Sequence, residues 1–301
     1  MRISGFSFAR NTDKLGYPIA ESIKSILPIC DEFIIAIGKG DDGDRTHELV
    51  ERINSPKITI IDTVWTDRET LKNGIYSQQT NIALGACKGD WCFYIQADEV
   101  LHEKHLDTIA KRCDILYNNK SVEGLLFGYR HFWGDYDHFQ AGHAWYPFEI
   151  RIIRNHIGIA SFGDAQSFLR NNEKLHVAYA NAFMYHYGYV RSPVLMHKRN
   201  VEIETTYRGA EEAKKLYEKA GDFFDYGPLN KRWTFTETHP AVLHDRIQKM
   251  DWKNLLTYSG KDNTRYNHDR LKYRVLSFLE NTFLHGKQIG GFKNYRLLKG
   301  L

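Results

Sequence analysis

Hydrophobic positions in the first 120 residues follow two alternating periods. Short apolar runs that predict β-strands occur at 3–9, 33–37, 57–62 and 91–95. Segments in which apolar residues recur at helical spacing occur at 13–27, 46–53, 72–87 and 106–117. Because strands and helices alternate with short links, we predict a parallel sheet flanked by helices. Such sheets bind ligands at the carboxyl ends of their strands.

The pattern changes after residue 120. Further strands are predicted at 124–132, 148–154 and 184–190, around an irregular segment that is rich in aromatic residues and histidine. From Pro193 onward the pattern is helical, with amphipathic segments at 202–219 and 271–284. We therefore divide the chain into a ligand-binding half at 1–118, a second half of the same domain at 119–192 and a helical C-terminal extension at 193–301.

Composition narrows the classes of partner. The 301 residues include 41 Lys and Arg against 37 Asp and Glu, and a net charge of +4 is too small and mixed for a nucleic-acid-binding protein. No segment approaches the about 20 apolar residues of a membrane span. The cysteines form no C-x-x-C pair, which excludes common zinc and redox motifs and favours a cytoplasmic protein with reduced thiols: Cys30, Cys87, Cys92 and Cys113.

The tail at 287–301 combines basic and apolar residues. Helices that lie on a membrane surface have this composition. We therefore expect either peripheral contact with the inner face of the membrane or an ordinary terminal helix, which could also form an oligomer contact.

A glycine motif offers one candidate chemistry. Gly38, Gly40 and Gly43 spell G-x-G-x-x-G between a strand and a helix, and Asp62 ends the next strand. This pattern is typical of an NAD(P)-dependent oxidoreductase. However, the motif follows the second strand rather than the first. Three carboxylates in the same turn would also repel a pyrophosphate: Asp41, Asp42 and Asp44. Glycines in a tight acidic turn are the alternative interpretation.

The end of the fourth predicted strand offers another candidate. It runs into Gln96, Ala97, Asp98 and Glu99, which places two carboxylates at the ligand-binding edge of the sheet. Carboxylate oxygens suit Mg²⁺ or Mn²⁺, and these ions also bridge phosphate oxygens. The alternative is that Asp98 and Glu99 only cap the helix that follows.

Four elements in this order resemble glycosyltransferase family two, which has the GT-A fold. They are the acidic Gly-rich turn at 37–46, Asn81-Ile82-Ala83, Gly89-Asp90-Trp91 and Gln96-Ala97-Asp98-Glu99, within residues 3–118. The block at 186–191, followed by Met196-His197-Lys198, is similar to a His-Tyr-Gly segment of some bacterial members. The sequence departs from the family at Gly38 and Gln96, where Asp is usual, and at Thr80, where Arg is common.

The resemblance implies a GT-A-type, Rossmann-like mixed sheet in which 1–118 binds a nucleotide-sugar and 119–192 binds the acceptor. It implies Mn or Mg as cofactor, with Asp98 and His186 as metal ligands and Glu99 acting through a water. A strand histidine satisfied by hydrogen bonds is the alternative for His186. Arg191 and Lys198 could pair with phosphate. The implied donor-binding residues are Phe8, Arg10, Gly38, Lys39, Asn81, Gln96, Ala97 and Asp98.

Transfer with inversion also needs a general base and an acceptor site. We choose Asp164 as the base, in a turn-like context, with Glu149, Asp135 and Asp137 as rivals. Trp133, Trp145 and Tyr146 could stack on an acceptor sugar, or the two tryptophans could belong to an aromatic core layer. A second group has metal-ligand residue types without a spacing that fits a known motif: His131, Asp135, His138 and His143.

Three hypotheses about function follow. The first is a metal-dependent, inverting glycosyltransferase that moves a sugar from a nucleoside-diphosphate sugar to a glycan or lipid-linked acceptor, such as a cell-surface polysaccharide precursor. The second is the oxidoreductase of the glycine motif. The third is a non-catalytic nucleotide- or sugar-binding module, left after Gly38 and Gln96 replaced the acidic residues of the family.

Overall fold

The N-terminal part of the chain alternates strands and helices as predicted. The computed structural model describes residues 1–65, 74–217, 222–229, 232–256, 267–284, 288–291 and 293–301. The strands are β1 (Ile3–Ala9), β2 (Glu32–Gly38), β3 (Ile58–Thr63) and β4 (Trp91–Tyr94). The helices are α1 (Ile19–Ile26), α2 (Thr46–Glu51), α4 (Ile75–Gly85) and α5 (Leu106–Leu116). The first two residues of the predicted helix at 72–87 lie outside the described residues.

The rest of the chain adds strands and then helices. The strands are β5 (Glu99–Leu101), β6 (Gly124–Trp133), β7 (His138–Gln140), β8 (Phe148–Arg154), β9 (Ile159–Phe162), β10 (Ser167–Arg170), β11 (Glu173–Tyr189), β12 (Trp233–Thr234) and β13 (Tyr295–Leu297). The helices are α6 (Pro193–Arg208), α7 (Ala210–Tyr217), α8 (His244–Gln248) and α9 (Leu271–Phe283). Single 3₁₀ turns occur at Leu27–Ile29, Glu103–His105, Ala241–Leu243, Lys253–Leu255 and Asn267–Asp269.

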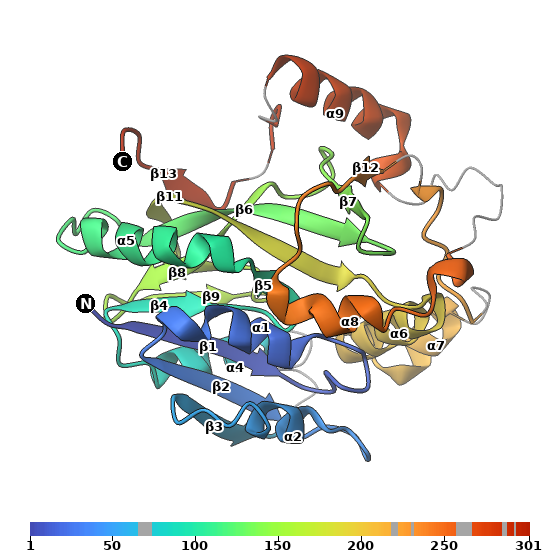
Figure 1. Cartoon of the computed structure of the whole chain (residues 1–301), viewed down its shortest axis with the longest axis horizontal. Helices are drawn as coiled ribbons and strands as arrows, with labels where there is room; N and C mark the ends of the chain where they lie inside the picture. The colour runs from blue at the N-terminus through green and yellow to red at the C-terminus, as the bar shows by residue number, and fades with distance from the viewer. Residues whose placement is uncertain (66–73, 218–221, 230–231, 257–266, 285–287, 292) are drawn as a thin grey trace.

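One mixed sheet contains strands from both predicted halves, 1–118 and 119–192 (Figure 1). Its main strands follow the order β3-β2-β1-β4-β8-β6-β11-β10-β9. The first four are parallel, whereas β8 runs antiparallel to both β4 and β6. The predicted α/β class, a mixed sheet flanked by helices, is therefore confirmed.

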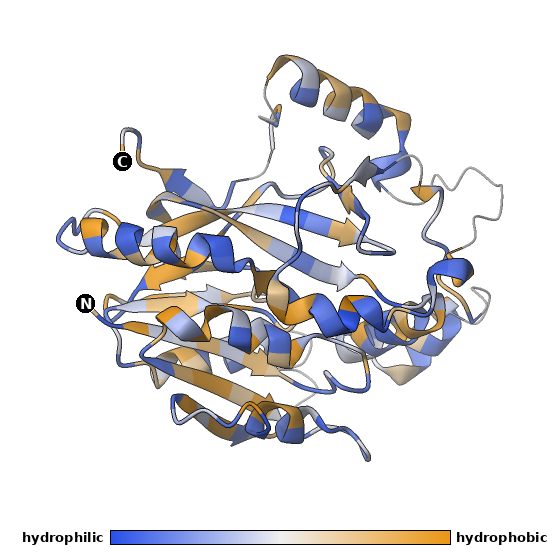
Figure 2. Ribbon diagram, in the orientation of Figure 1, coloured by the Kyte–Doolittle hydropathy of each residue, from blue (hydrophilic) through white to orange (hydrophobic). Residues whose placement is uncertain are grey.

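The central strands of this sheet are largely hydrophobic (Figure 2). Apolar side chains pack on both of its faces. On one face, Ile23 of α1 and Ile109 of α5 pack on strand residues such as Phe93. On the other face, Ala83 and Leu84 of α4 pack on their own set of strand residues. Burial on both faces explains why β2 and β4 are continuous apolar runs.

The structure corrects three local predictions. Helix α1 begins at Ile19, directly after Pro18, rather than at residue 13, because the chain first turns through Gly16 at a φ of 69°. The residues after Asp98 form strand β5 rather than the start of a helix, so a helix-capping role for Asp98 and Glu99 is wrong. The tail is not a helix over its described residues, because Tyr295–Leu297 pairs with β11.

Candidate functional site

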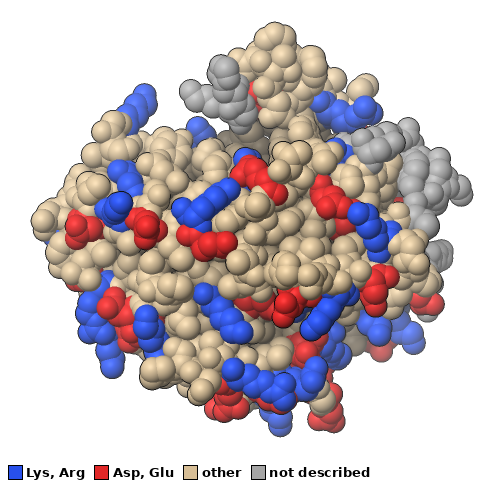
Figure 3. All heavy atoms as spheres, viewed as in Figure 1, with Lys and Arg blue, Asp and Glu red and all other residues tan. Residues whose placement is uncertain are grey.

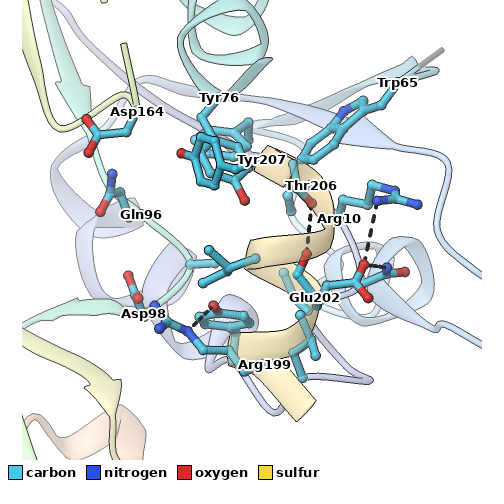
Figure 4. A pocket seen from close by; sticks show the side chains of 18 residues that line it. Arg10, Trp65, Tyr76, Gln96, Asp98, Asp164, Arg199, Glu202, Thr206 and Tyr207 are labelled. Atoms are coloured by element: carbon cyan, nitrogen blue, oxygen red, sulfur yellow. Dashed lines mark hydrogen bonds and ion pairs between the residues drawn. The ribbon is translucent and has the colours of Figure 1, made fainter. Parts of the chain in front are cut away.

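A cavity of about 400 Å³ lies at the carboxyl ends of β1 and β4, and α6 closes it (Figure 4). The turn after β1 and the loop after β4 supply one side. Helix α6 supplies the other side with residues spaced three and four apart: Arg199, Glu202, Ile203, Thr206 and Tyr207. The cavity therefore joins the predicted donor half to the C-terminal extension.

Aromatic rings form one wall of the cavity. Phe8 and Tyr76 stack with ring centroids 5.5 Å apart, and Trp65 lies 5.8 Å from Tyr76. A Cβ at Gly38 would lie 2.4 Å from Nε1 of Trp65, so glycine at this position leaves room for the indole. This is a physical reason for a glycine rather than an Asp at this position. The indole Nε1 is buried and has no acceptor among the described residues.

A polar network closes the turn that carries the glycine motif. Arg10 donates from Nε to the carbonyl oxygen of Lys39 at 3.0 Å and pairs with Asp41 at 3.2 Å. Lys14 forms a short ion pair with the same carboxylate, and this hydrogen bond lowers the pKa of Asp41. Glu202 of α6 accepts from Nδ2 of Asn11 at 3.0 Å. The acidic turn is thus held by cations of this chain.

Strand pairing brings Asp98 and His186 together. The antiparallel pairing of β5 with β11 sets Glu99 opposite His186, and the amide of Tyr187 donates to the carbonyl oxygen of Asp98 at 2.7 Å. Oδ2 of Asp98 then lies 3.5 Å from Nε2 of His186, and both residues are buried. Burial alone would raise the pKa of Asp98, but the nearby charges of His186, Arg199 and Arg191 hold it well below its usual range.

The space beside this pair fits a small cation. A Cβ at Gly188 would lie 2.7 Å from both Asp98 Oδ2 and His186 Nε2, so glycine keeps this place open. Two ligands that share a cation with bonds of about 2.1 Å lie roughly 3.0–3.6 Å apart, and the observed distance falls in that range. Among the described residues, no group of three or more His, Cys, Asp and Glu side chains could hold a metal. The protein would thus supply two ligands, and phosphate oxygens and water could supply the rest.

A buried histidine behind His186 orients its ring. Nε2 of His131 lies 2.8 Å from the carbonyl oxygen of Tyr146, which can only accept, so this nitrogen donates. Burial lowers the pKa of His131 far below its usual value, so the ring is neutral and its Nδ1 is an acceptor. That acceptor lies 3.2 Å from Nδ1 of His186, which therefore carries the proton. Nε2 of His186, which faces Asp98, is left as the nitrogen that can bind a cation.

Glu99 has a different role from its neighbour. Its carboxylate forms two hydrogen bonds with Arg151, at 2.9 and 2.7 Å, and both side chains are fully buried. The hydroxyl of Tyr129 donates to the same carboxylate at 2.6 Å. Glu99 is therefore occupied by Arg151 and Tyr129, and does not support the expected contact with a metal through a water.

Two arginines place positive charge near Asp98. Arg199 lines the cavity and donates to the hydroxyl of Tyr17 at 3.0 Å. Arg191 is buried and donates to the carbonyl oxygen of Leu15 at 2.7 Å, while its Nε and Nη2 have no acceptor among the described residues. Its guanidinium lies 4.3 Å from the ring centroid of Tyr17, which lines the cavity, whereas Arg191 itself does not. Lys198 is exposed and does not line the cavity.

Five of the eight predicted donor-binding residues line the cavity: Phe8, Arg10, Gln96, Ala97 and Asp98. Three do not. Gly38 and Lys39 lie behind it, where they contact Trp65 and Arg10. Asn81 exchanges two hydrogen bonds with the backbone of Ser161, at 3.0 and 2.8 Å, so it fixes β9 instead.

The chosen base, Asp164, lines the same cavity and is exposed. Its turn is attached to the loop after β4, because Nε2 of Gln96 donates to the carbonyl oxygen of Ala165 at 3.2 Å. The rival carboxylates are engaged elsewhere and do not line the cavity. Glu149 accepts from Gln166 and Asn294, Asp135 accepts from His138, and Asp137 pairs with Lys253.

The predicted acceptor residues do not line the cavity. Trp133 is buried in a cluster with Met196 and Tyr226, and Trp145 packs against it as a half-buried ring. Tyr146 is half-buried and supplies the carbonyl oxygen that His131 contacts. The group of His131, Asp135, His138 and His143 does not form one cluster. His138 pairs with Asp135, whereas His143 pairs with Glu280 of α9. A role of these residues in acceptor binding stays a prediction.

Sequence reasoning missed the face of α6 and the aromatic wall. The polar residues of α6 have the spacing of a solvated helix face, although they line the cavity. Their sequence signal was the recurrence of positions 199, 202, 203, 206 and 207 at intervals of three and four, shortly after the His-Tyr-Gly block. Trp65 gave no signal, because it follows a strand in a segment without periodicity.

Comparisons with known proteins give a partial likeness of fold. No protein-family model matches the chain, and the search of curated proteins gives no match. A structure of S. aureus TarS aligns with 74% of this chain and 43% of that chain, at 16% identity and a TM-score of 0.38. A structure of S. aureus TarS in complex with UDP aligns with 44% of this chain and 36% of that chain, at 20% identity and a TM-score of 0.31.

Glucosyl-3-phosphoglycerate synthase from Mycobacterium tuberculosis, in complex with Mn²⁺, UDP and phosphoglyceric acid, aligns with 42% of each chain. The identity is 18% and the TM-score is 0.31. The chain thus spans less than half the length of these three solved structures. A likeness at this level concerns part of the fold and does not establish what this chain binds.

Proposed function

We propose that the chain is a metal-dependent glycosyltransferase that moves a sugar, with inversion, from a nucleoside-diphosphate sugar to a glycan or lipid-linked acceptor. One observation carries the proposal. Asp98 and His186 converge beside the open space at Gly188, next to a cavity that has an aromatic wall. The cavity volume of about 400 Å³ lies within the range of small-molecule sites. The order of the family-two motifs along the sequence supports the same class.

Each part of the cavity has a matching part of the donor. The rings of Phe8, Trp65 and Tyr76 suit a nucleobase, which binds by stacking. Asp98 and His186 would hold Mn or Mg, and Arg199 would contact the diphosphate. The bound metal would neutralise the negative charge that develops on the leaving diphosphate.

Asp164 is our proposed general base. It would accept the proton of the acceptor hydroxyl while that oxygen forms a bond to the anomeric carbon. The bond from this carbon to the diphosphate oxygen breaks in the same step, and the nucleoside diphosphate leaves with its electron pair. Attack from the face opposite the leaving group inverts the anomeric centre.

A nucleotide panel tests this function. We expect Tm to rise by about 5 °C with one of UDP, GDP, CDP or dTDP at saturating concentration, and only when Mn²⁺ is present. Hydrolysis or transfer of the matching nucleotide-sugar should then be detectable by release of that nucleoside diphosphate. A shift with NAD that ignores Mn²⁺ would instead support the oxidoreductase, and binding without turnover would support the non-catalytic module.

The aromatic wall supplies a matched pair of variants for this panel. Trp65→Ala should weaken nucleotide binding by about 5- to 150-fold, because stacking of a base on an aromatic ring contributes roughly 1–3 kcal/mol. Trp233→Ala removes a tryptophan of β12 that does not line this cavity and should bind as the wild type does. An equal loss of nucleotide affinity in both variants would contradict a nucleobase-binding site at Trp65.

The histidine pair predicts a further effect on metal binding. In His131→Leu, Nδ1 of His186 loses its acceptor, so the ring is free to put its proton on Nε2. We expect Mn²⁺ affinity, measured without nucleotide by electron paramagnetic resonance, to fall about 10- to 100-fold. His131→Asn keeps an oxygen acceptor near the former Nδ1 and should retain most of the affinity.

The tautomer of His186 can also be measured directly. In the Mg²⁺-bound protein, side-chain ¹⁵N NMR should show a protonated Nδ1 and an Nε2 without a proton on His186, and His131→Leu should change that pattern. His138→Leu removes a histidine that is bound to Asp135 and should change neither measurement. An unchanged Mn²⁺ affinity in His131→Leu would show that His131 does not orient the ligand.

A further inference from the structure

Helix α9 stands at the outer edge of the molecule (Figure 1). Several of its large apolar side chains are exposed to solvent. Leu271, Phe278 and Phe283 are exposed to 74%, 63% and 66%. Val275 and Leu279 are exposed as well. Exposed apolar groups that occur singly are ordinary, but a contiguous set on one helix marks an interaction surface.

The spacing of these residues places them on one side of α9. They recur at intervals of three and four over 271–283, which is the period of one helical face. We call this set the α9 apolar face: Leu271, Val275, Phe278, Leu279 and Phe283. Figure 3 shows the projection at this edge as mostly uncharged surface.

Buried polar contacts on the other side of α9 fix this orientation. Oγ of Ser277 accepts from the amide of His143 at 2.8 Å. Oε1 of Glu280 lies 2.6 Å from Nδ1 of His143 and accepts from the amide of Ile289 at 2.7 Å. Because Ser277 and Glu280 are buried against the body of the protein, the apolar face is held outward.

Among the described residues of α9 and its start, the exposed charges have one sign. Arg270, Lys272 and Arg274 are exposed, and no ion pair involves them among the described residues. The two carboxylates of this segment are paired inward, Asp269 with Arg232 and Glu280 with His143. An exposed helix that combines aromatic and aliphatic residues with basic ones complements an anionic lipid surface.

We propose that α9 is an interfacial helix by which the protein docks on an anionic membrane. Its 13 residues extend about 20 Å, which is too short to cross a bilayer but suits a helix that lies in the interface. None of the helices in the described part of the chain is long and apolar enough to cross a membrane. Phe278 and Phe283 would enter the acyl boundary, while Lys272 and Arg274 would reach the headgroup phosphates.

Charge favours a lipid surface over a second copy of the chain. A second copy of α9 offers no exposed carboxylate that could pair with these basic residues. Anionic headgroups supply that missing charge. The docking surface does not depend on the proposed sugar transfer, although it would hold the enzyme near lipid-linked acceptors.

Vesicle co-sedimentation of the full chain tests the proposal. We expect binding to vesicles of phosphatidylglycerol mixed with phosphatidylcholine and much weaker binding to phosphatidylcholine alone. Phe278→Ser combined with Phe283→Ser should weaken binding at least about tenfold, because two inserted rings are lost. Neutralising Lys272 and Arg274 to Gln should weaken it roughly 25-fold at low salt, because each basic side chain near such a surface contributes about 1 kcal/mol.

A matched control uses exposed apolar residues elsewhere. Leu216→Ser combined with Phe223→Ser should bind vesicles as the wild type does, since both residues are exposed and lie outside α9. Equal binding to neutral and anionic vesicles, or no binding to either, would overturn the proposal. So would a lipid-free dimer that the Phe278 and Phe283 changes dissociate, because it would identify a second copy as the occupant. Circular dichroism and Tm measurements verify that each variant is folded.

Discussion

Asp98→Asn is expected to lower Mn²⁺ affinity at least about 100-fold and to abolish the metal-dependent stabilisation by nucleotide. The amide has nearly the same shape as the carboxylate but lacks the charge that a hard divalent ion requires. The loss corresponds to about 2.7 kcal/mol of binding free energy. Turnover of the nucleotide-sugar should fall with it, because the leaving diphosphate loses its counter-charge. Calorimetric titration with Mn²⁺, with and without nucleotide, measures the change.

Glu202→Gln is the matched control for Asp98→Asn. It removes a negative charge from the same cavity, but its carboxylate accepts from Asn11 and lies near Arg10 rather than near His186. We expect Mn²⁺ affinity to stay within a few-fold of the wild type. If both variants lost the same affinity, the net charge of the cavity would explain metal binding, and Asp98 would not be a ligand.

Gln96 and Asp98 could be located from the sequence because they follow a fully buried parallel strand. Such a strand is a continuous apolar run, and its end marks the ligand-binding edge of the sheet. The contact between Asp98 and His186 could not be derived in this way. It depends on β5, a strand of three residues that pairs with β11 far along the chain, and so short a segment carries no periodic signal. Only the family resemblance brought His186 into the site.

The remaining differences also have physical causes. Trp133 and Trp145 belong to a stretch without clear periodicity. Its sequence is compatible both with a flexible loop and with a packed aromatic layer. In the structure, Trp133 is buried in such a layer. The tail at 287–301 is basic, but three of its residues add a strand to β11, because an edge of the sheet is open there. We therefore propose membrane contact through α9 rather than through the tail.

Arg151→Met is expected to destabilise the fold by about 3–5 kcal/mol, although Arg151 does not line the cavity. The change leaves the carboxylate of Glu99 fully buried without its counter-charge. Because Glu99 begins β5 next to Asp98, the same change should loosen the strand that holds Asp98 beside His186. Chemical denaturation with urea measures the free energy of unfolding, and a loss under about 1 kcal/mol would show that the pair is not a buried charge pair.

Glu99→Gln in the Arg151→Met background separates charge from packing. Glutamine keeps an oxygen that can accept from the hydroxyl of Tyr129 but carries no charge, so the double variant should be more stable than Arg151→Met alone. The two changes should therefore be strongly non-additive. Asp98→Asn should show the opposite pattern, with metal binding lost and stability nearly kept. These measurements would then assign different roles to two adjacent carboxylates after β4. Asp98 binds the metal, and Glu99 stabilises the fold that positions Asp98.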